Sequence, residues 1–409
     1  LLLLLLVTVR PASPQASGFV GAGGGLGVWI NGGVGITTPP ASSSASTEYA
    51  ALQAWKTAIT EDPSGVLATW SGPDVCSYRG VFCSTPPTPD GTSPSPSGRL
   101  VVSAIDLNKA NLRGTLVKEL ALLPHLSVLH LNSNRFFGTV PDALRDMGSL
   151  TELDLSNNRF SGPFPTPTLF IPNLVYLDLR FNGFSGEVPG ELFLKDLDAI
   201  FLNNNDFEGQ IPMSLWGSPA SVVSLANNRF SGAIPSGFGG YMGSSSSGGG
   251  GIREILFLNN RLTGCIPEGL GFLTEMEVLD LSFNSLTGHL PGTLSCLSSV
   301  QVLNLAHNQL SGMLPDLVCS LRTLLNLTIS YNFFSGFSQD CGRGFRSLWF
   351  DFSGNCIPGR GMQRPPPECV GVPGEGMSCL RIPPGQPVAC GVPMGGIAAG
   401  FPYAMPSSP

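Results

Sequence analysis

The chain has 409 residues, of which 42% are hydrophobic and only 12% are charged. Its net charge is −7, and the stretch from Arg99 to Ile357 carries 15 Lys and Arg against 21 Asp and Glu. This acidity argues against a nucleic-acid partner and mildly favours a basic one, although a generic acidic soluble protein would show the same balance.

The first ten residues, LLLLLLVTVR, are typical of the end of a signal-peptide hydrophobic segment. They are too short to span a bilayer, and no other run reaches about 18 apolar residues. Residues 11–47 are rich in Gly, Ser and Pro, so we expect disorder there. The ten cysteines lie mostly toward the two ends, which fits an oxidising compartment. The sequence therefore predicts an extracellular protein without a membrane anchor.

Residues 48–98 read as an N-terminal cap with a Pro-rich insertion at 84–98. Leu52, Trp55 and Ile59 fall on one face of a predicted amphipathic helix. Cys76 and Cys83 stand seven residues apart, and we expect them to form a local disulfide.

A repeated unit dominates residues 99–340, and LTELDLSNNRFSGPFP at 150–165 is one copy. Apolar residues stand at its first, fourth, sixth and eleventh places, Asn at the ninth, Gly at the thirteenth and often Pro at the sixteenth. The ninth-place Asn recurs at steps of 23 or 24, except for one step of 32 that contains a Ser- and Gly-rich insertion. These residues are Asn134, Asn158, Asn182, Asn205, Asn228, Asn260, Asn284, Asn308 and Asn332. This is the leucine-rich repeat pattern.

The physical reading of one unit is a single coil of a solenoid. The alternating apolar residues predict a short strand with one face inward. A buried Asn can satisfy the backbone groups that leave the strand, and Gly permits positive φ on the return path. One coil cannot bury its apolar face alone, so neighbours must stack on it. We expect an α/β solenoid of about ten coils with a parallel strand face, an N-terminal helical cap and a Cys-rich C-terminal cap.

The C-terminal cysteines leave several connectivities open. Cys319 and Cys341 lie in adjacent coils and form a plausible pair, whereas Cys265 with Cys296 is compatible but not required. Residues 341–392 read as a cap running into a Cys- and Pro-rich hinge, with Cys356 and Cys369 as further disulfide candidates. Residues 393–409 read as a linker or the truncated start of a tail.

The sequence shows no catalytic, phosphate-binding or zinc-binding motif, so we expect neither an enzyme nor a bound cofactor or metal. We expect binding on the strand face, where the third, fifth, seventh and eighth places point outward. Exposed aromatic residues beside carboxylates suit a cationic partner. The candidate residues are Glu152, Asp154, Tyr176, Asp178, Arg180, Phe181, Phe201, Asp280, Phe283, His307 and Tyr331. Asn326, in Asn-Leu-Thr, is a candidate glycosylation site on a strand, where a glycan would block that end of the face.

The segments AWKTAITEDPSGVLATWSGPDVCSYRGVFC, NLTISYNFFSGFSQDC and NCIPGRGMQRPPPEC resemble plant leucine-rich repeat extensin proteins. The resemblance covers roughly residues 48–390 and is specific in both caps. It implies a secreted cell-wall glycoprotein whose repeats bind small, basic, Cys-containing peptides of the rapid alkalinization factor type. It also implies action as a dimer in cell-wall organization and cell expansion, and cell-wall polysaccharide is a further candidate partner. No Ser-Pro repeats follow Cys390, so the resemblance leaves covalent anchoring in the wall open.

Two other functions fit the repeat. One is an inhibitor of a secreted wall-degrading enzyme, similar to plant polygalacturonase-inhibiting proteins, which lack this Cys- and Pro-rich hinge. The other is a purely structural wall protein, which the missing Ser-Pro repeats disfavour. A receptor ectodomain is disfavoured because the sequence shows no membrane-spanning run.

Overall fold

The computed structural model describes residues 43–86, 100–236, 251–319, 321–337, 341, 348–372 and 390. The predicted segments 1–10 and 393–409 lie outside these residues, as do most of 11–47 and most of the two insertions. The described chain begins with helix α1 (Ser43–Ala58), which forms the predicted cap. The placement of Ile59 on this helix is wrong: Ile59 begins strand β1 (Ile59–Glu61), which pairs with β4 (Arg113–Gly114).

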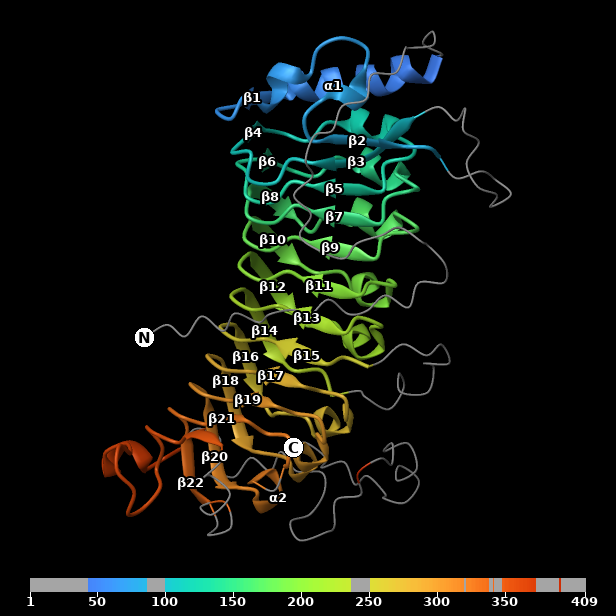
Figure 1. Ribbon diagram of the computed structural model, residues 1–409. Coiled ribbons are helices and arrows are strands. Elements are labelled where there is room, and N and C mark those ends of the chain that lie inside the picture. Colours follow the sequence, from blue (N-terminus) through green and yellow to red (C-terminus); the bar gives the residue numbers. More distant parts are fainter. Residues whose placement is uncertain are drawn as a thin grey trace, which may run out of the picture. The chain divides into compact units, whose positions relative to one another are not determined.

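A 12-stranded sheet forms one side of the stack (Figure 1). All its neighbours are parallel except β2, which pairs antiparallel with β3. The strands are β2 (Val81–Ser84), β3 (Val101–Asp106), β5 (Val128–His130), β7 (Glu152–Asp154), β9 (Tyr176–Asp178), β11 (Ala199–Phe201), β13 (Val222–Ser224), β15 (Glu254–Leu256), β17 (Val278–Asp280), β19 (Val302–Asn304), β21 (Asn326–Thr328) and β23 (Trp349–Asp351). Equivalent places of successive coils pair directly, as Glu152 does with Tyr176, so each place forms a column along the solenoid.

A nine-stranded parallel sheet forms a second side. It contains β6 (Phe137–Gly138), β8 (Arg159–Pro163), β10 (Gly183–Glu187), β12 (Asp206–Gln210), β14 (Arg229–Ala233), β16 (Arg261–Gly264), β18 (Ser285–His289), β20 (Gln309–Leu314) and β22 (Phe333–Phe337). Most coils then pass through one short 3-10 helix, and one coil through helix α2 (Asp316–Cys319). The 3-10 helices of the repeats are η3 (Lys118–Leu122), η4 (Asp142–Asp146), η5 (Thr166–Phe170), η6 (Gly190–Leu194), η7 (Met213–Gly217), η9 (Glu268–Phe272) and η10 (Gly292–Cys296). These observations confirm the predicted leucine-rich repeat solenoid.

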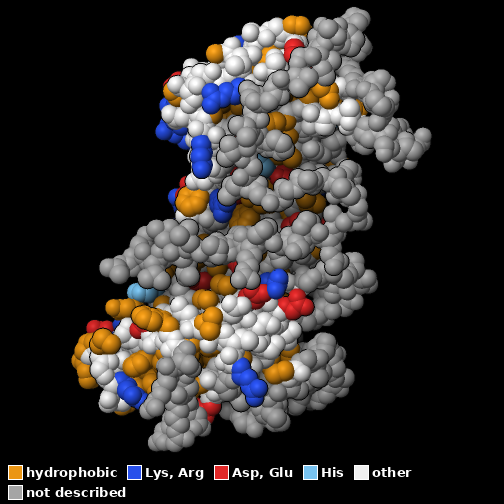
Figure 2. Space-filling model, in the orientation of Figure 1, with side chains coloured by type: hydrophobic (Ala, Val, Ile, Leu, Met, Phe, Trp, Pro, Cys, Tyr) orange, Lys and Arg blue, Asp and Glu red, His pale blue; other side chains and the backbone are white. Residues whose placement is uncertain are grey.

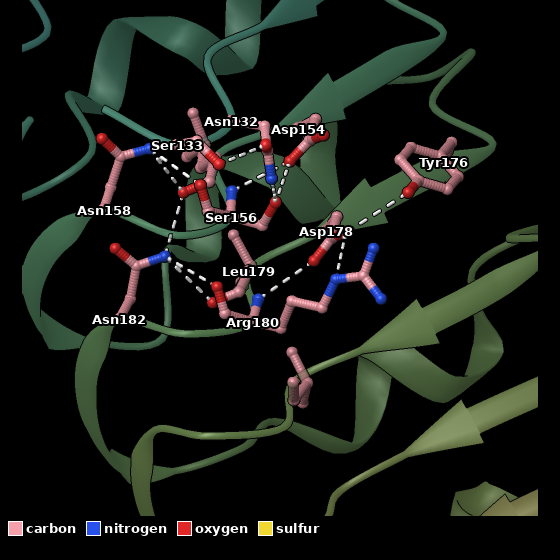
Figure 3. Close-up of polar contacts among 12 residues, drawn as sticks. Asn132, Ser133, Asp154, Ser156, Asn158, Tyr176, Asp178, Leu179, Arg180 and Asn182 are labelled. Carbon is pink, nitrogen blue, oxygen red and sulfur yellow. Dashed lines mark hydrogen bonds and ion pairs between the residues drawn. The ribbon is translucent and has the colours of Figure 1, made fainter. Parts of the chain in front are cut away.

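The ninth-place Asn residues bind neighbouring coils together, as predicted. Nδ2 of Asn158 donates to the carbonyl oxygens of Leu131 in the preceding coil (2.8 Å) and Leu155 in its own coil (3.1 Å). Its Oδ1 accepts the backbone N–H of Phe136 at 2.9 Å. Asn182 repeats this arrangement one coil later (Figure 3). Each Asn therefore satisfies backbone groups that the turn after the strand would otherwise leave unpaired.

Aromatic rings form a second continuous feature inside the stack. The eleventh-place rings of Phe136, Phe160, Phe184 and Phe207 are fully buried and stack with centroids 6.2–6.3 Å apart. Trp55 of α1 stacks on Phe136 at 5.9 Å, and its Nε1 donates to the Thr115 carbonyl oxygen at 3.1 Å. The cap therefore continues the core of the repeats, which explains why a helix can close the first coil.

Four disulfides join described residues. Cys76–Cys83, Cys319–Cys341 and Cys356–Cys369 pair as the sequence suggests. The compatible pairing of Cys265 with Cys296 is wrong, because Cys296 pairs with Cys390, 94 residues away. Sequence alone could not identify this pair, since its two cysteines lie far apart in the chain and the spacing of cysteines does not determine their connectivity. Within the described residues, no helix has the length and apolar character needed to cross a membrane.

We predict that Asn205→Ala lowers the free energy of unfolding by about 2–3 kcal/mol. The change leaves the carbonyl oxygens of Leu179 and Leu202 and the N–H of Phe184 without their side-chain partner. The matched control is Asn203→Ala in the same coil, which is half-buried and should change stability by less than about 0.5 kcal/mol. Chemical denaturation compares the two variants, and equal effects would contradict a special role of the ninth place.

Candidate functional site

The candidate site is the outward surface of the 12-stranded sheet, which we call the strand face. The structure brings the predicted residues onto it in columns. Glu152 and Tyr176 occupy the third place, Asp154, Asp178, Phe201 and Asp280 the fifth, Arg180 the seventh, and Phe181, Phe283, His307 and Tyr331 the eighth. Residues of one column face each other across adjacent strands, so their side chains form continuous rows.

The expected exposure of Asp178, Asp280 and Phe201 is wrong, since all three are buried. The two acids share a local turn, in which a fifth-place carboxylate accepts the backbone N–H two residues later. Oδ1 of Asp280 accepts the N–H of Ser282 at 2.9 Å, and Oδ1 of Asp178 accepts that of Arg180 at 3.1 Å. Asp154 does the same with Ser156 (Figure 3). These carboxylates are therefore already hydrogen-bonded to the backbone at the strand end, which leaves them less able to pair with a partner.

Asp178 lies at the centre of a compact cluster. Its Oδ2 accepts the hydroxyl of Tyr176 at 3.3 Å and lies 2.8 Å from Nε of Arg180. The Arg180 guanidinium covers the Phe201 ring at 4.9 Å, and the Tyr176 and Phe201 rings lie 6.1 Å apart. Burial raises the pKa of Asp178 to about 7, despite the opposing effect of Arg180. Burial also raises the pKa of Tyr176, and the Asp178 charge adds to that effect.

A second polar pair lies on the two strands that precede this cluster in the sheet. Nε2 of His130 on β5 is 2.9 Å from Oε2 of Glu152 on β7. Burial lowers the pKa of His130, but the hydrogen bond and charge of Glu152 outweigh it, so the net shift is upward. His130 correspondingly lowers the pKa of Glu152 against the opposing effect of burial. Glu152 is therefore partly neutralised within the strand face.

The eighth place has a backbone conformation that the sequence does not reveal. Non-glycine residues there have positive φ, between 52° and 59°, from Ser133 in β5's coil to Tyr331 in β21's coil. Asn tolerates this left-handed region, and Asn fills the place in several coils. Phe283, His307 and Tyr331 are bulky residues for which it is strained.

These three residues form what we call the aromatic ladder. The ring centroids of Phe283 and His307 lie 4.1 Å apart, those of His307 and Tyr331 lie 4.4 Å apart, and both pairs are stacked. Phe283 and Tyr331 are about half exposed. Burial, and then the charge of Arg364, lower the pKa of His307, which favours its neutral form. The ladder is thus an exposed apolar row at one edge of the strand face.

The C-terminal coils add residues that the sequence analysis missed. Trp349 occupies the third place on β23 with 72% of its surface exposed, and Met362 of the following cap is also highly exposed. Hydrophobic side chains gather over these coils in the lower part of Figure 2. The unit around Asn355 keeps the ninth-place Asn and apolar residues at the fourth, sixth and eleventh places, but it has Ser347 at the first. It lies within residues 341–392, which were predicted to be a cap rather than a repeat. Hydrogen bonding of Asn355 to Phe334 and Ile329 shows that it is a true coil.

The remaining features of the described residues offer fewer groups that could bind a partner. A hollow of about 800 Å³ lies against the nine-stranded sheet, lined by Glu187, Gln210 and several prolines, and contains none of the predicted site residues. Across the described ranges, no three His, Cys, Asp or Glu side chains meet in a metal-binding group. Asn326 lies on β21, where its Oδ1 accepts the hydroxyl of Thr328 at 3.1 Å, and its glycosylation stays a prediction.

Comparison with protein families supports this architecture. The family described as leucine rich repeat N-terminal domain matches residues 45–84, and the family described as leucine rich repeat matches residues 124–184 and 252–310. The first match contains α1 and the Cys76–Cys83 disulfide, and the second contains two groups of coils.

Comparison with curated proteins shows which leucine-rich repeat proteins the chain resembles. Over 155 residues, the chain is 63% identical to leucine-rich repeat extensin-like protein 5 of Arabidopsis thaliana, covering 37% of this chain and 17% of that protein. Over this stretch, the chain is similar to leucine-rich repeat extensin-like proteins. The aligned part spans less than a fifth of the length of that relative.

Solved structures similar to this chain include plant receptors in complexes. One is the Arabidopsis receptor kinase HAESA in complex with the peptide hormone IDA and the co-receptor SERK1. It is 29% identical with a TM-score of 0.59, over 70% of this chain and 46% of that chain. Another is the plant peptide hormone receptor RGFR1 in complex with RGF2, at 27% identity and a TM-score of 0.57, over 62% of this chain and 40% of that chain.

We predict that Asp178 makes the repeats less stable as pH rises. Its pKa is about 7 when folded, against an ordinary value of 3.8 for aspartate, so the folded chain holds the proton more tightly. This contribution to stability is complete below about pH 4 and is lost as pH rises through 7, on the order of 2–3 kcal/mol between pH 5 and 8.

Asp178→Asn keeps the acceptor of the strand-end turn but cannot titrate. Its unfolding free energy should fall less between pH 5 and 8 than that of the natural chain, measured by urea denaturation. Glu208→Gln removes a charge from an exposed residue that has no ion pair within the described residues, so it reports the effect of net charge alone. Parallel pH profiles for the natural chain and Asp178→Asn would contradict the prediction.

Proposed function

We propose that this chain is a non-enzymatic, extracellular cell-wall module that captures a small, basic, Cys-containing peptide of the rapid alkalinization factor type on its strand face. Capture would couple the peptide to wall integrity and cell expansion. The observation that carries this proposal is the aromatic ladder of Phe283, His307 and Tyr331.

The ladder supports binding because the fold does not need it. Asn fills the same left-handed place in neighbouring coils, for example Asn259 directly before Phe283. A bulky residue there costs on the order of 1 kcal/mol or more of backbone strain. Three consecutive coils accept that cost and leave half of Phe283 and Tyr331 in solvent. Rigid, partly exposed aromatic side chains are the usual anchors of protein interfaces.

Charge supports a basic partner. The repeat region from Arg99 to Ile357 has a balance of −6. A buried carboxylate contributes to the long-range field only while it is ionised, so Asp178 adds to steering above its pKa of about 7, and the other acids of the repeats supply the field below it. The acidic field would speed the encounter, and the aromatic ladder would hold the partner.

The comparisons support peptide capture as the class of function. HAESA and RGFR1 are named as structures with a peptide hormone and with RGF2, and this chain shares their repeat architecture. The family name and the disulfides support an extracellular setting. The identity of the peptide, the wall setting and dimer formation belong to the proposal.

We predict that Phe283→Asn weakens binding of a folded basic rapid-alkalinization-type peptide by at least about tenfold. The change removes one anchor but supplies the residue that this backbone conformation favours, so stability should change by less than about 1 kcal/mol. Calorimetric titration gives the affinity, and thermal unfolding gives the stability.

The control is Phe170→Ala, which removes an exposed ring from η5, away from the strand face. It should bind the peptide as the natural chain does. Equal affinity of Phe283→Asn and the natural chain would contradict the role of the ladder. If the natural chain binds no such peptide but inhibits a wall-degrading enzyme, the inhibitor alternative replaces this proposal.

A further inference from the structure

The outward places of the strand face are the third, fifth, seventh and eighth of each coil, from Ala104 to Gly354. Arg180 is the one arginine among them. Its side chain is held in one position by two groups. Nε lies 2.8 Å from Oδ2 of Asp178, and the guanidinium carbon lies 4.9 Å from the centre of the Phe201 ring. The Arg180 backbone N–H also donates to Oδ1 of Asp178, which ties the main chain to the same carboxylate. The guanidinium is therefore preorganised.

The outer edge of this guanidinium has no partner. Within the described part of the chain, neither Nη1 nor Nη2 makes a hydrogen bond or an ion pair, and in Figure 3 both point away from Asp178. The side chain retains 36% exposure. The nearby carboxylates are engaged elsewhere, because Asp154 accepts from Ser156 and Glu152 pairs with His130.

We propose that Arg180 is a carboxylate-binding residue of the strand face, whose Nη1–Nη2 edge takes one carboxylate of the peptide partner. A planar guanidinium matches a carboxylate through two parallel hydrogen bonds, and a preorganised one loses little entropy when it binds. The inference rests on the proposed function and adds that the basic partner presents an anionic group. That group is either its C-terminal carboxylate or an Asp or Glu side chain.

Asp178 makes this site responsive to protons. The charged or titratable groups that face it are Arg180 and Tyr176 and, from β7, Asp154; Phe201 on β11 adds no charge. Burial raises the pKa of Asp178 to about 7. Protonation removes the negative charge beside Nε, so the guanidinium attracts an incoming carboxylate more strongly. Carboxylate binding at Arg180 should therefore be tighter at pH 5.5 than at pH 8.

The first test needs no peptide. Sodium acetate is titrated into the full chain at pH 5.5 and pH 8, against sodium chloride, while the side-chain Nε–Hε resonances of arginine are followed by NMR. Arg180→Lys assigns the signal, and exposed Arg159 on β8 is the internal control. We expect a saturable shift of the Arg180 signal, larger at pH 5.5, that Asp178→Asn makes independent of pH. A response no larger than that of Arg159 would overturn the proposal.

The second test identifies the source of the carboxylate. The natural chain and Arg180→Gln are titrated with the basic peptide bearing a free C-terminus, an amidated C-terminus, or amides at its acidic side chains. Arg180→Gln should lose about tenfold in affinity for the parent peptide. The natural chain should bind the peptide form that lacks the recognised carboxylate about tenfold more weakly than the parent peptide. Arg180→Gln should bind that form and the parent peptide with equal affinity.

Arg159→Gln is the matched control for lost charge and should bind all peptide forms as the natural chain does. Equal affinity of Arg180→Gln and the natural chain for every form would overturn the assignment. A chain that responds to acetate at Arg180 but binds no basic peptide would refute the proposed function and retain the carboxylate site. A response to uronate oligosaccharides in place of peptides would assign the site to a wall polysaccharide and overturn the peptide assignment.

Discussion

The hydrogen bonds of the ninth-place Asn are the interaction on which the structure depends. Each amide joins a carbonyl of its own coil to a carbonyl and an N–H of the preceding coil, as Asn158 does with Leu155, Leu131 and Phe136. Short strands alone would leave these turn groups buried and unpaired. Because the bridge repeats in the coils from Asn134 to Asn355, equivalent places stay in register, and a side chain acquires neighbours one repeat away in the sequence. The strand face is a direct product of that register.

The sequence predicted the repeats well because their determinants are local. The Asn period, the apolar places and Trp55 of the cap each act within one coil or its neighbour, so pattern and physics agree. Predictions failed where the determinant is remote, as in the disulfide that joins Cys296 to Cys390, 94 residues away. The coil that carries Trp349 keeps its Asn bridge and most of its apolar places, but it was predicted to be part of a cap.

The candidate site was predicted as a surface but not in its chemistry. Alternation along a strand predicts which residues point outward, yet fifth-place carboxylates bond to the backbone at the strand end, and Asp178 and Asp280 are buried. The positive φ of the eighth place brings Phe283, His307 and Tyr331 into stacking contact, and the sequence pattern carries no information on that dihedral angle. The acids are therefore largely structural, and the exposed rings form the proposed binding surface.

A rigid row of aromatic side chains in an acidic repeat domain leads to one central claim, which is capture of a basic peptide by the strand face. The most direct measurement is calorimetric titration of the intact chain with a folded, basic, disulfide-containing peptide at low and at physiological salt. The account predicts saturable binding that weakens as salt screens the acidic field, with a residual affinity from the apolar contacts. Absence of binding at both salt concentrations, by a chain that still unfolds cooperatively, would contradict it.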